Sequence, residues 1–347
     1  MATMKGVTYL GDHVIKVNPN LDMPAPGPDQ VMIKVAYAAL CATDIHGMEG
    51  LIGGPSRINE SRAIGHECSG TIIELGSNAQ DKGLAVGDRV VCDPGAYCGV
   101  CEGCKAGKKC MSPPPATSGG CMAEYKTYHL SSVHKIPDNL PLKRAVLVEP
   151  MTCVIQALDL TMPHVGETAC LSGAGGIGML LLRAIKRAGL SNITVLEPVE
   201  EKWPIIRELG AINIINPLKQ NVQEECAKLT NGRGFDYVFE ASGVSAATPA
   251  CLDIMGYGGT VIYFAVYNAD FELPVNLNQL YRKEGRLQTV FVKRTNWPRA
   301  VRLVAEDDAV LDKVIGLEVP LDEAPRAFEA FYTSKYSKIV LNIGGED

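Results

Sequence analysis

The chain has 347 residues, of which 46% are hydrophobic and 21% are charged, and its formal net charge is −6. This length predicts about two domains of roughly 150 residues each, and the negative charge argues against nucleic acid or an anionic membrane as a partner. No apolar run reaches the about 18 residues of a membrane span and the first residues lack the apolar core of a signal peptide, so we expect a cytoplasmic protein.

The first part of the chain is predicted to form a β-rich domain over residues 1–149. Short apolar or alternating runs are separated by glycine, proline and aspartate, as is typical of strands. These runs lie at 31–40, 69–76, 88–94 and 122–130.

Residues that could bind a metal occur at three places in this domain. Cys41 begins the segment CATDIH, His66 and Glu67 lie in GHE, and Glu149 lies in VEP. A thiolate, an imidazole and a carboxylate with one open coordination position are typical of catalytic zinc. Each motif is unspecific alone, since a lone cysteine is usually a core residue. Occurring together and in this order, the motifs indicate a metal centre.

Four of the 12 cysteines are clustered. They are Cys98, Cys101, Cys104 and Cys110. Disulfides are disfavoured in the cytosol, so the cluster favours metal binding. A DNA-binding zinc finger is not expected, because the surroundings are not basic and the net charge is negative.

From about residue 150 the pattern changes to alternating strands and helices, which predicts a doubly wound parallel sheet. The predicted strands lie at 168–173, 192–197, 212–217, 235–243 and 258–266, and the predicted helices at 177–190, 199–211, 221–230 and 245–255. The alternation ends near 285, and a helix at 297–307 and a strand at 337–343 follow. We therefore assign 150–286 to a second domain.

A glycine-rich motif joins the first strand of this second domain to its first helix. It comprises Gly173, Gly175, Gly176, Ile177 and Gly178 in the pattern G-x-G-x-x-G. Such a turn lets the backbone approach a pyrophosphate at the positive end of the helix dipole. Glu197 ends the next strand, where a carboxylate would accept hydrogen bonds from the adenosine ribose and repel a 2′-phosphate. The motif therefore predicts NAD rather than NADP as cofactor.

Taken together, these motifs resemble those of the zinc-dependent medium-chain dehydrogenase/reductase family, over essentially the whole chain. The resemblance rests on C-x-T-D-x-H, G-H-E, G-D-R-V, the cysteine cluster, V-E-P and G-x-G-x-x-G. It implies an N-terminal GroES-like catalytic domain, to which residues 287–347 return, and a Rossmann domain over 150–286. Within the family, V-E-P is similar to the branch of sorbitol, butanediol and threonine dehydrogenases.

The resemblance also implies roles for single residues. Cys41 and His66 would bind catalytic zinc, with Glu67 and Glu149 as ligands directly or through water. Asp44 would orient the imidazole ligand. Thr43 would hydrogen-bond the substrate hydroxyl, and His46 would pass its proton towards solvent.

The cluster Cys98, Cys101, Cys104 and Cys110 resembles the structural zinc lobe of the family. Its last spacing is two residues shorter than usual in the family. Four-cysteine zinc is the main interpretation, and an unoccupied lobe or a disulfide remains open.

The substrate is the least specified part of the prediction. We expect a zinc- and NAD-dependent dehydrogenase of a polyol, sugar derivative or amino alcohol. The Arg-Tyr pair of sorbitol dehydrogenases is replaced by Val292 and Lys293, so a threonine, sugar-acid or sugar-phosphate substrate stays open. A zinc-free reductase and a non-catalytic binding protein are the alternatives. The family resemblance favours a homodimer or homotetramer.

Overall fold

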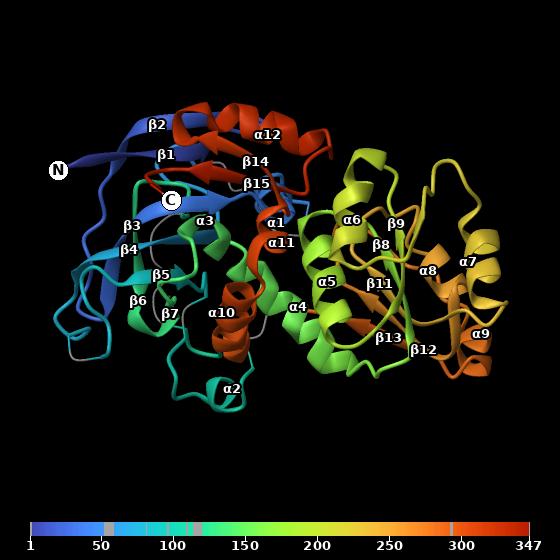
Figure 1. The fold of residues 1–347 in the computed structure, drawn as a ribbon. Helices are drawn as coiled ribbons and strands as arrows, with labels where there is room; N and C mark the ends of the chain where they lie inside the picture. Colours follow the sequence, from blue (N-terminus) through green and yellow to red (C-terminus); the bar gives the residue numbers. More distant parts are fainter. Residues whose placement is uncertain are drawn as a thin grey trace. The chain divides into compact units, whose positions relative to one another are not determined.

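The computed structural model describes residues 2–51, 59–80, 82–95, 97–108, 110–113, 120–291 and 294–346. The chain divides into two compact units. Unit 1 joins Met1–Thr152 to Lys293–Asp347, and unit 2 is the intervening segment Cys153–Val292. The C-terminal part of the chain therefore returns to the N-terminal unit, and we describe each unit by itself (Figure 1).

Unit 1 is built on β-sheets. A two-stranded sheet pairs β1 (Thr3–Tyr9) with β2 (Ile15–Asp22). In the described residues a larger sheet has the order β14 (Ile315–Pro320), β15 (Lys338–Asn342), β3 (Gln30–Ala39), β4 (Glu67–Leu75), β5 (Arg89–Cys92) and β7 (Val133–Lys135), and β6 (Tyr125–His129) also pairs with β3. The antiparallel pairing of β15 with β3 attaches the end of the chain to the first sheet.

The helices of unit 1 are mostly short. They are α1 (Ala42–Met48), α2 (Glu102–Lys105), α3 (Leu142–Ala145), α10 (Trp297–Glu306), α11 (Asp308–Asp312) and α12 (Ala324–Tyr332), and the boundary between the units falls within α4 (Val148–Thr161). The amphipathic α12 buries Ala324, Ala327 and Phe328, whose spacing places them on one face. That face contributes to the core of the large sheet. Single 3-10 turns of unit 1 lie at Leu130–Ser132, Arg294–Asn296 and Leu321–Glu323, and one of unit 2 lies at Glu200–Lys202.

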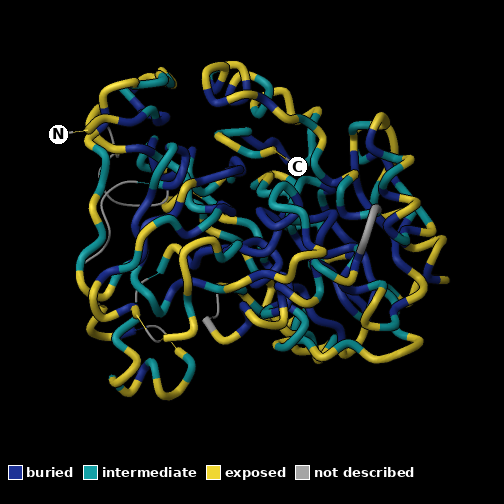
Figure 2. Tube along the Cα trace, turned by 60° about the vertical axis from the view of Figure 1, so that its left-hand side comes forward, coloured by how far each residue is buried: buried dark blue, intermediate teal, exposed yellow. Residues whose placement is uncertain are grey.

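Unit 2 contains a parallel sheet with the order β10 (Asn213–Ile215), β9 (Asn192–Leu196), β8 (Thr168–Ser172), β11 (Phe235–Glu240), β12 (Met255–Tyr263) and β13 (Arg286–Thr289). Its helices are α5 (Gly176–Arg187), α6 (Trp203–Leu209), α7 (Val222–Thr230), α8 (Ala250–Asp253) and α9 (Leu277–Arg282). The central strands are buried, as their apolar sequences require (Figure 2). This strand order is that of doubly wound dinucleotide-binding sheets, which confirms the predicted fold class.

Two details differ from the sequence prediction. The helix expected over 245–255 is reduced to α8, which begins after Pro249, and turns occupy most of the preceding residues. In addition, β13 pairs in parallel with β12, so the parallel sheet extends beyond the boundary expected at 286. Because β13 is a short edge strand of mixed polarity, it lacks the apolar run by which buried strands are recognised.

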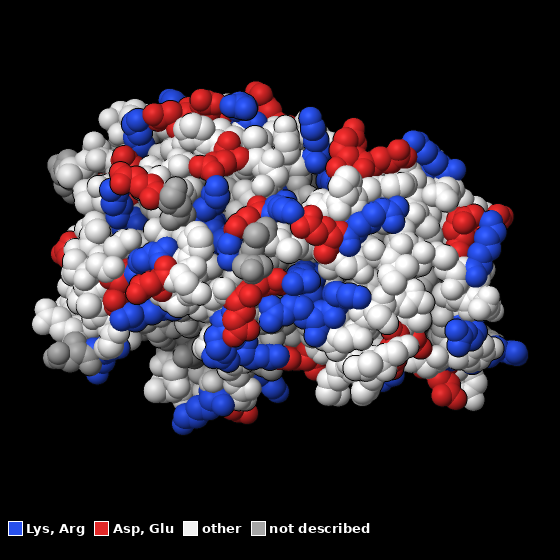
Figure 3. Space-filling model, in the orientation of Figure 1, with Lys and Arg blue, Asp and Glu red and all other residues white. Residues whose placement is uncertain are grey.

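Two further observations concern membrane-spanning helices and surface charge. No helix in the described part of the chain is both long and apolar enough to cross a bilayer. On the face drawn in Figure 3, cationic and anionic side chains are interspersed rather than segregated.

Candidate functional site

Helix α1 carries the first group of predicted site residues in unit 1. The chain leaves β3 through Leu40, whose N–H donates to the carbonyl of Ile339 at 3.0 Å. Cys41 then precedes the helix in an extended conformation. Ile45 and Met48 are buried, so the packing of these two side chains fixes the direction in which the polar residues of α1 point.

Three of the predicted metal ligands come together in unit 1. One ligand atom each of Cys41, His66 and Glu67 lies within 4.8 Å of the other two. Glu67 is the first residue of β4, next to β3 in the sheet, and His66 directly precedes it. This set of a thiolate, an imidazole and a carboxylate fits catalytic zinc, which takes three protein ligands and keeps one position open.

His66 is oriented by Asp44, as expected. Its Nδ1 donates a hydrogen bond to Asp44 Oδ1 at 2.7 Å, which leaves Nε2 for a metal. Burial lowers the pKa of His66, but the Asp44 carboxylate and the Cys41 sulfur together outweigh it, and the resulting pKa lies well above the ordinary value. In the metal-free protein the imidazole therefore retains a proton that a metal must displace.

Glu67 has a partner that the sequence did not indicate. The buried Lys338 of β15 forms an ion pair with its Oε2. Because Glu67 is only 1% exposed, this cation compensates a carboxylate that has lost its hydration. In the sequence, Lys338 is simply the polar start of an apolar strand, so it gave no signal of this role.

Glu149, in the first turn of α4, lies outside the group formed by Cys41, His66 and Glu67. It is buried nonetheless. Burial raises its pKa to about 7, with His66 opposing this effect and Glu67 adding to it. Glu149 is therefore electrostatically coupled to the ligand group, and a direct bond to the metal stays a prediction.

Thr43 and His46 are one turn apart on α1 and therefore share a helix face. Both are partly buried. Within the described residues, the buried Nδ1 of His46 has no hydrogen-bond partner, and it remains available to a ligand or a water molecule.

The four clustered cysteines form a second group in unit 1, around α2. Their sulfurs lie within 4.8 Å of one another, with 4.0 Å between those of Cys98 and Cys104 and 3.9 Å between those of Cys101 and Cys110. Four sulfurs at about 2.3 Å from a tetrahedral zinc ion are about 3.8 Å apart. All four cysteines are free of disulfides, so the shortened lobe still has the dimensions of a zinc site.

Backbone groups stabilise thiolates in this cluster. The N–H groups of Met111 and Cys104 donate to the sulfur of Cys101 at 3.4 Å each, and they lower its pKa to about 6. Thiolates bind zinc, whereas thiols do not. The backbone therefore favours the ligand form of Cys101 before any metal is present, whereas burial raises the pKa of Cys104 to about 11.

The glycine motif lies in unit 2, between β8 and α5. Gly173 has a φ of +92°, a conformation that suits glycine. A Cβ on Gly178 would lie 2.1 Å from the carbonyl oxygen of Gly173, whereas a Cβ on Gly175 would meet nothing within 4 Å. Gly176 and Ile177 begin α5. The motif thus combines close packing of strand and helix with open space at Gly175, which fits a bound pyrophosphate.

Glu197 follows β9 and is buried. Its Oε2 accepts a hydrogen bond from the N–H of Ala174 at 2.9 Å, and its Oε1 accepts one from Val199 at 2.9 Å. Lys202 Nζ lies 3.8 Å from Oε1. The carboxylate is therefore tied to the glycine motif, and Lys202 is a neighbour that sequence reasoning missed.

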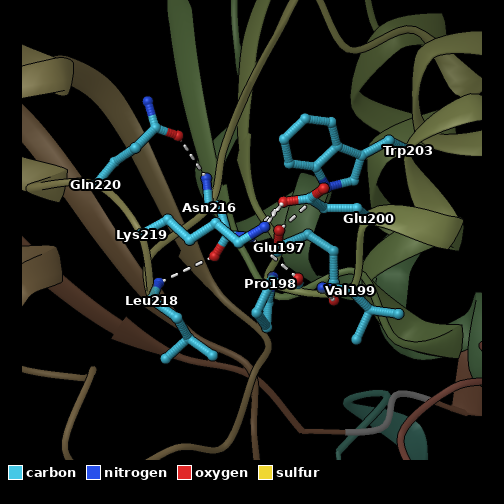
Figure 4. A network of polar contacts seen from close by, with 9 residues as sticks. All are labelled: Glu197, Pro198, Val199, Glu200, Trp203, Asn216, Leu218, Lys219 and Gln220. Carbon is cyan, nitrogen blue, oxygen red and sulfur yellow. Dashed lines mark hydrogen bonds and ion pairs between the residues drawn. The ribbon is translucent and has the colours of Figure 1, made fainter.

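A polar network supports the segment after Glu197 (Figure 4). Asn216 Nδ2 donates to the carbonyl of Pro198 at 3.2 Å and to Glu200 Oε1 at 3.0 Å. Lys219 Nζ donates to the same Glu200 oxygen at 2.6 Å. These contacts fix the loops at the carboxyl ends of β9 and β10. Val292 and Lys293, which entered the substrate argument, lie outside the described residues.

Two family models match the chain. Residues 27–138 match the alcohol dehydrogenase GroES-like domain, and residues 176–306 match the zinc-binding dehydrogenase domain. The first match lies within unit 1 and the second covers most of unit 2.

Solved and curated relatives extend the likeness to nearly the whole chain. A protein of Clostridium scindens described as a zinc-binding dehydrogenase is 32% identical, with a TM-score of 0.89 over 98% of this chain and 99% of that one. A protein of Sinorhizobium meliloti described likewise, and bound to NADP, is 27% identical, with a TM-score of 0.88 over 99% of this chain and 100% of that one. D-arabitol-phosphate dehydrogenase of Enterococcus avium is 29% identical over 99% of both chains.

Proposed function

The chain belongs to the zinc-dependent medium-chain alcohol dehydrogenase superfamily, and on this premise we propose that it interconverts a secondary alcohol and a ketone with NAD as cofactor. The substrate class is a polyol, a sugar derivative or an amino alcohol. One observation carries the proposal: the ligand atoms of Cys41, His66 and Glu67 converge within 4.8 Å, and Cys41 directly precedes the helix that bears Thr43 and His46.

Zinc would be held by Cys41, His66 and Glu67, and would supply Lewis-acid polarisation of the substrate oxygen. Asp44 orients the imidazole through the hydrogen bond described above. Lys338 forms an ion pair with Oε2 of Glu67. The carboxylate would thus be shared between a cation of the chain and the metal, which would limit how strongly it binds the metal.

Two residues of α1 would transfer the proton of the substrate hydroxyl towards solvent. As the hydroxyl of Thr43 accepts the proton of the substrate hydroxyl it would release its own, and His46, one turn further on, would pass a proton towards solvent. The buried Nδ1 of His46 has no partner in the described residues, so the imidazole is not engaged by another side chain. Removal of this proton is what allows the carbon to release hydride to the nicotinamide.

The preference for NAD is supported by charge at the end of β9. The buried carboxylate of Glu197 lies where the adenosine ribose binds in this fold, and it would repel a 2′-phosphate. The relative from Sinorhizobium meliloti is bound to NADP, so the preference requires a direct comparison. We expect kcat/KM for NAD to exceed that for NADP by at least about tenfold, and equal values would contradict this assignment.

The substrate class is tested by a panel of alcohols. D-Arabitol-phosphate dehydrogenase is similar over nearly its whole length, so the panel includes polyol phosphates beside polyols, sugar acids and threonine. Formation of NADH with a secondary alcohol of one of these groups would support the proposal. Turnover of simple primary alcohols alone, or of none of the panel, would contradict it.

A further inference from the structure

A buried carboxylate lies in unit 2 outside the predicted site. Glu240 is the last residue of β11 and is 0% exposed. A carboxylate removed from water is costly unless hydrogen-bond donors surround it. The donors that surround Glu240 therefore show what this position holds together.

Both carboxylate oxygens of Glu240 accept hydrogen bonds from loops that follow strands. Oε1 accepts from the hydroxyl and, at 2.9 Å, the N–H of Ser242, just beyond β11. Oε2 accepts from the hydroxyl of Tyr267, beyond β12. Thr248 Oγ1 lies 3.1 Å from the same hydroxyl. The side chain of Glu240 therefore joins the loop after β11 to the loop after β12.

The main chain of Glu240 reinforces this connection. Its carbonyl accepts hydrogen bonds from the N–H groups of Phe264 at 2.9 Å and Ala265 at 3.2 Å. The ring of Tyr267 stacks on Phe271, with 5.0 Å between the ring centres. The ring and the hydroxyl of Tyr267 are thus both fixed, and the phenol is held against the carboxylate.

The joined loops border the glycine motif. A Cβ on Gly173 would lie 2.6 Å from Ser242 Cα, and the N–H of Ala241 donates to the carbonyl of Ser172 at 2.9 Å. The glycine motif directly follows β8, and β11 lies next to β8 in the sheet (Figure 1). Between these two strands the strand order reverses, and ligands of such sheets bind outside the carboxyl ends at that point.

The topology indicates which half of the dinucleotide these loops would meet. The sheet consists of two mononucleotide-binding halves, here β8 to β10 and β11 to β13. Glu197 follows β9 and so assigns the adenosine to the first half. The loops held by Glu240 belong to the second half, which leaves them the nicotinamide nucleotide.

We propose that Glu240 and Tyr267 are positioning residues that hold the loops after β11 and β12 in the shape that receives the nicotinamide half of the cofactor. This inference rests on the proposed function, since it assumes a nicotinamide dinucleotide in this crevice. Neither residue touches the reacting atoms; both act through the backbone of the loops that they connect.

The test compares the affinity for the whole cofactor with the affinity for its adenosine half. In Tyr267→Phe the ring remains but the hydroxyl is lost, and we expect the Kd for NADH, measured by fluorescence, to rise about tenfold. The Kd for AMP, measured by calorimetry, should stay within about twofold. Tyr281→Phe, which alters a tyrosine that is 83% exposed in the same unit, is the matched control and should change neither constant.

A second variant guards against a loss of folding. Glu240→Gln keeps the shape of the side chain but introduces an amide that cannot accept hydrogen bonds from both loops. It should likewise raise the Kd for NADH and leave the Kd for AMP unchanged. Thermal unfolding of each variant without ligand shows whether unit 2 is intact. An unchanged Kd for NADH in Tyr267→Phe, or equal losses for NADH and AMP, would overturn the inference. If the wild-type protein binds neither ligand, the proposed function fails and this inference fails with it.

Discussion

At the scale of residues, the candidate metal centre depends on pairs of charges that neutralise each other in a buried environment. Asp44 holds His66, and Lys338 holds Glu67. These two of the three candidate ligands therefore each have a partner that fixes their orientation, as is usual for zinc sites in enzymes. The sequence indicated the first pair through the CATDIH motif. It could not indicate the second, because the lysine comes from the far end of the chain.

Replacing Asp44 tests the orienting hydrogen bond. In Asp44→Asn the side chain keeps its shape but loses its charge, so His66 is held less firmly. We expect zinc affinity at this site to fall about 10- to 100-fold, measured by competition with a chelating dye. Asn78→Asp, which alters an exposed asparagine in unit 1, serves as a control. An unchanged affinity in Asp44→Asn would mean that the hydrogen bond does not support the metal.

Replacing Glu149 tests the effect of its raised pKa. With a pKa of about 7 against an ordinary 4.5, the folded metal-free protein binds more protons than the unfolded chain between these values. Its stability therefore falls as the pH rises from about 4.5 to 7. Glu149→Gln removes this pH-dependent loss of stability. At pH 8 the free energy of unfolding of the variant should exceed that of the metal-free wild type by about 1–3 kcal/mol.

Urea denaturation of the two metal-free proteins at several pH values measures this difference. The curves should converge near pH 4.5, where the carboxyl group is protonated in the folded protein. Parallel curves over the whole range would show that Glu149 does not titrate in the way described.

At the scale of elements, strands with regular patterns were predictable and elements that depend on tertiary contacts were not. The strand-turn-helix around Gly173 follows from local sequence, because the apolar run, the glycines and the helical spacing all agree. Helix α1 has only 7 residues, including Thr43 and Gly47, which are weak helix formers. It is stabilised by packing of Ile45 and Met48, which the sequence does not reveal.

The two later glycines of the motif give a matched pair of variants. Gly175→Ala adds a methyl group to open space, so stability should not change, but NADH affinity should fall more than about tenfold because the methyl group occupies the pyrophosphate position. Gly178→Ala forces a contact with the carbonyl of Gly173, which would lie 2.1 Å away. It should lower the free energy of unfolding by about 1–3 kcal/mol. Thermal melts and NADH titrations distinguish the two effects. A loss of stability in Gly175→Ala, with a loss of NADH affinity but not of stability in Gly178→Ala, would contradict this assignment.

The four-cysteine lobe can be tested by the number of metal ions bound. Cys110→Ser should lose about one equivalent of zinc, because the hydroxyl does not replace the thiolate in a closed tetrahedral site. The zinc bound near Cys41 should remain. Elemental analysis after gel filtration measures both, and an unchanged zinc content would show that the lobe does not hold this metal.

At the scale of the whole molecule, the two units have separate tasks. Unit 1 gathers residues distant in sequence, from Cys41 to Lys338, around the candidate metal centre. Unit 2 provides the doubly wound sheet and the glycine motif. The sequence predicts two domains because a change from a strand-rich to an alternating pattern is a property of long segments, and the bounds 1–149 with 287–347 and 150–286 stay a prediction. A homodimer or homotetramer stays a prediction, which light scattering of the purified protein would test.

The central claim is that turnover with NAD requires zinc bound at Cys41. It is tested most directly by measuring NADH formation and bound zinc together in the wild type and in Cys41→Ser, with the best secondary alcohol of the panel. We predict that the wild type holds about two equivalents of zinc, and that the variant keeps the zinc of the lobe and its affinity for NADH but loses at least about a thousandfold in rate. Undiminished turnover in Cys41→Ser, or in wild-type protein freed of zinc, would contradict the claim.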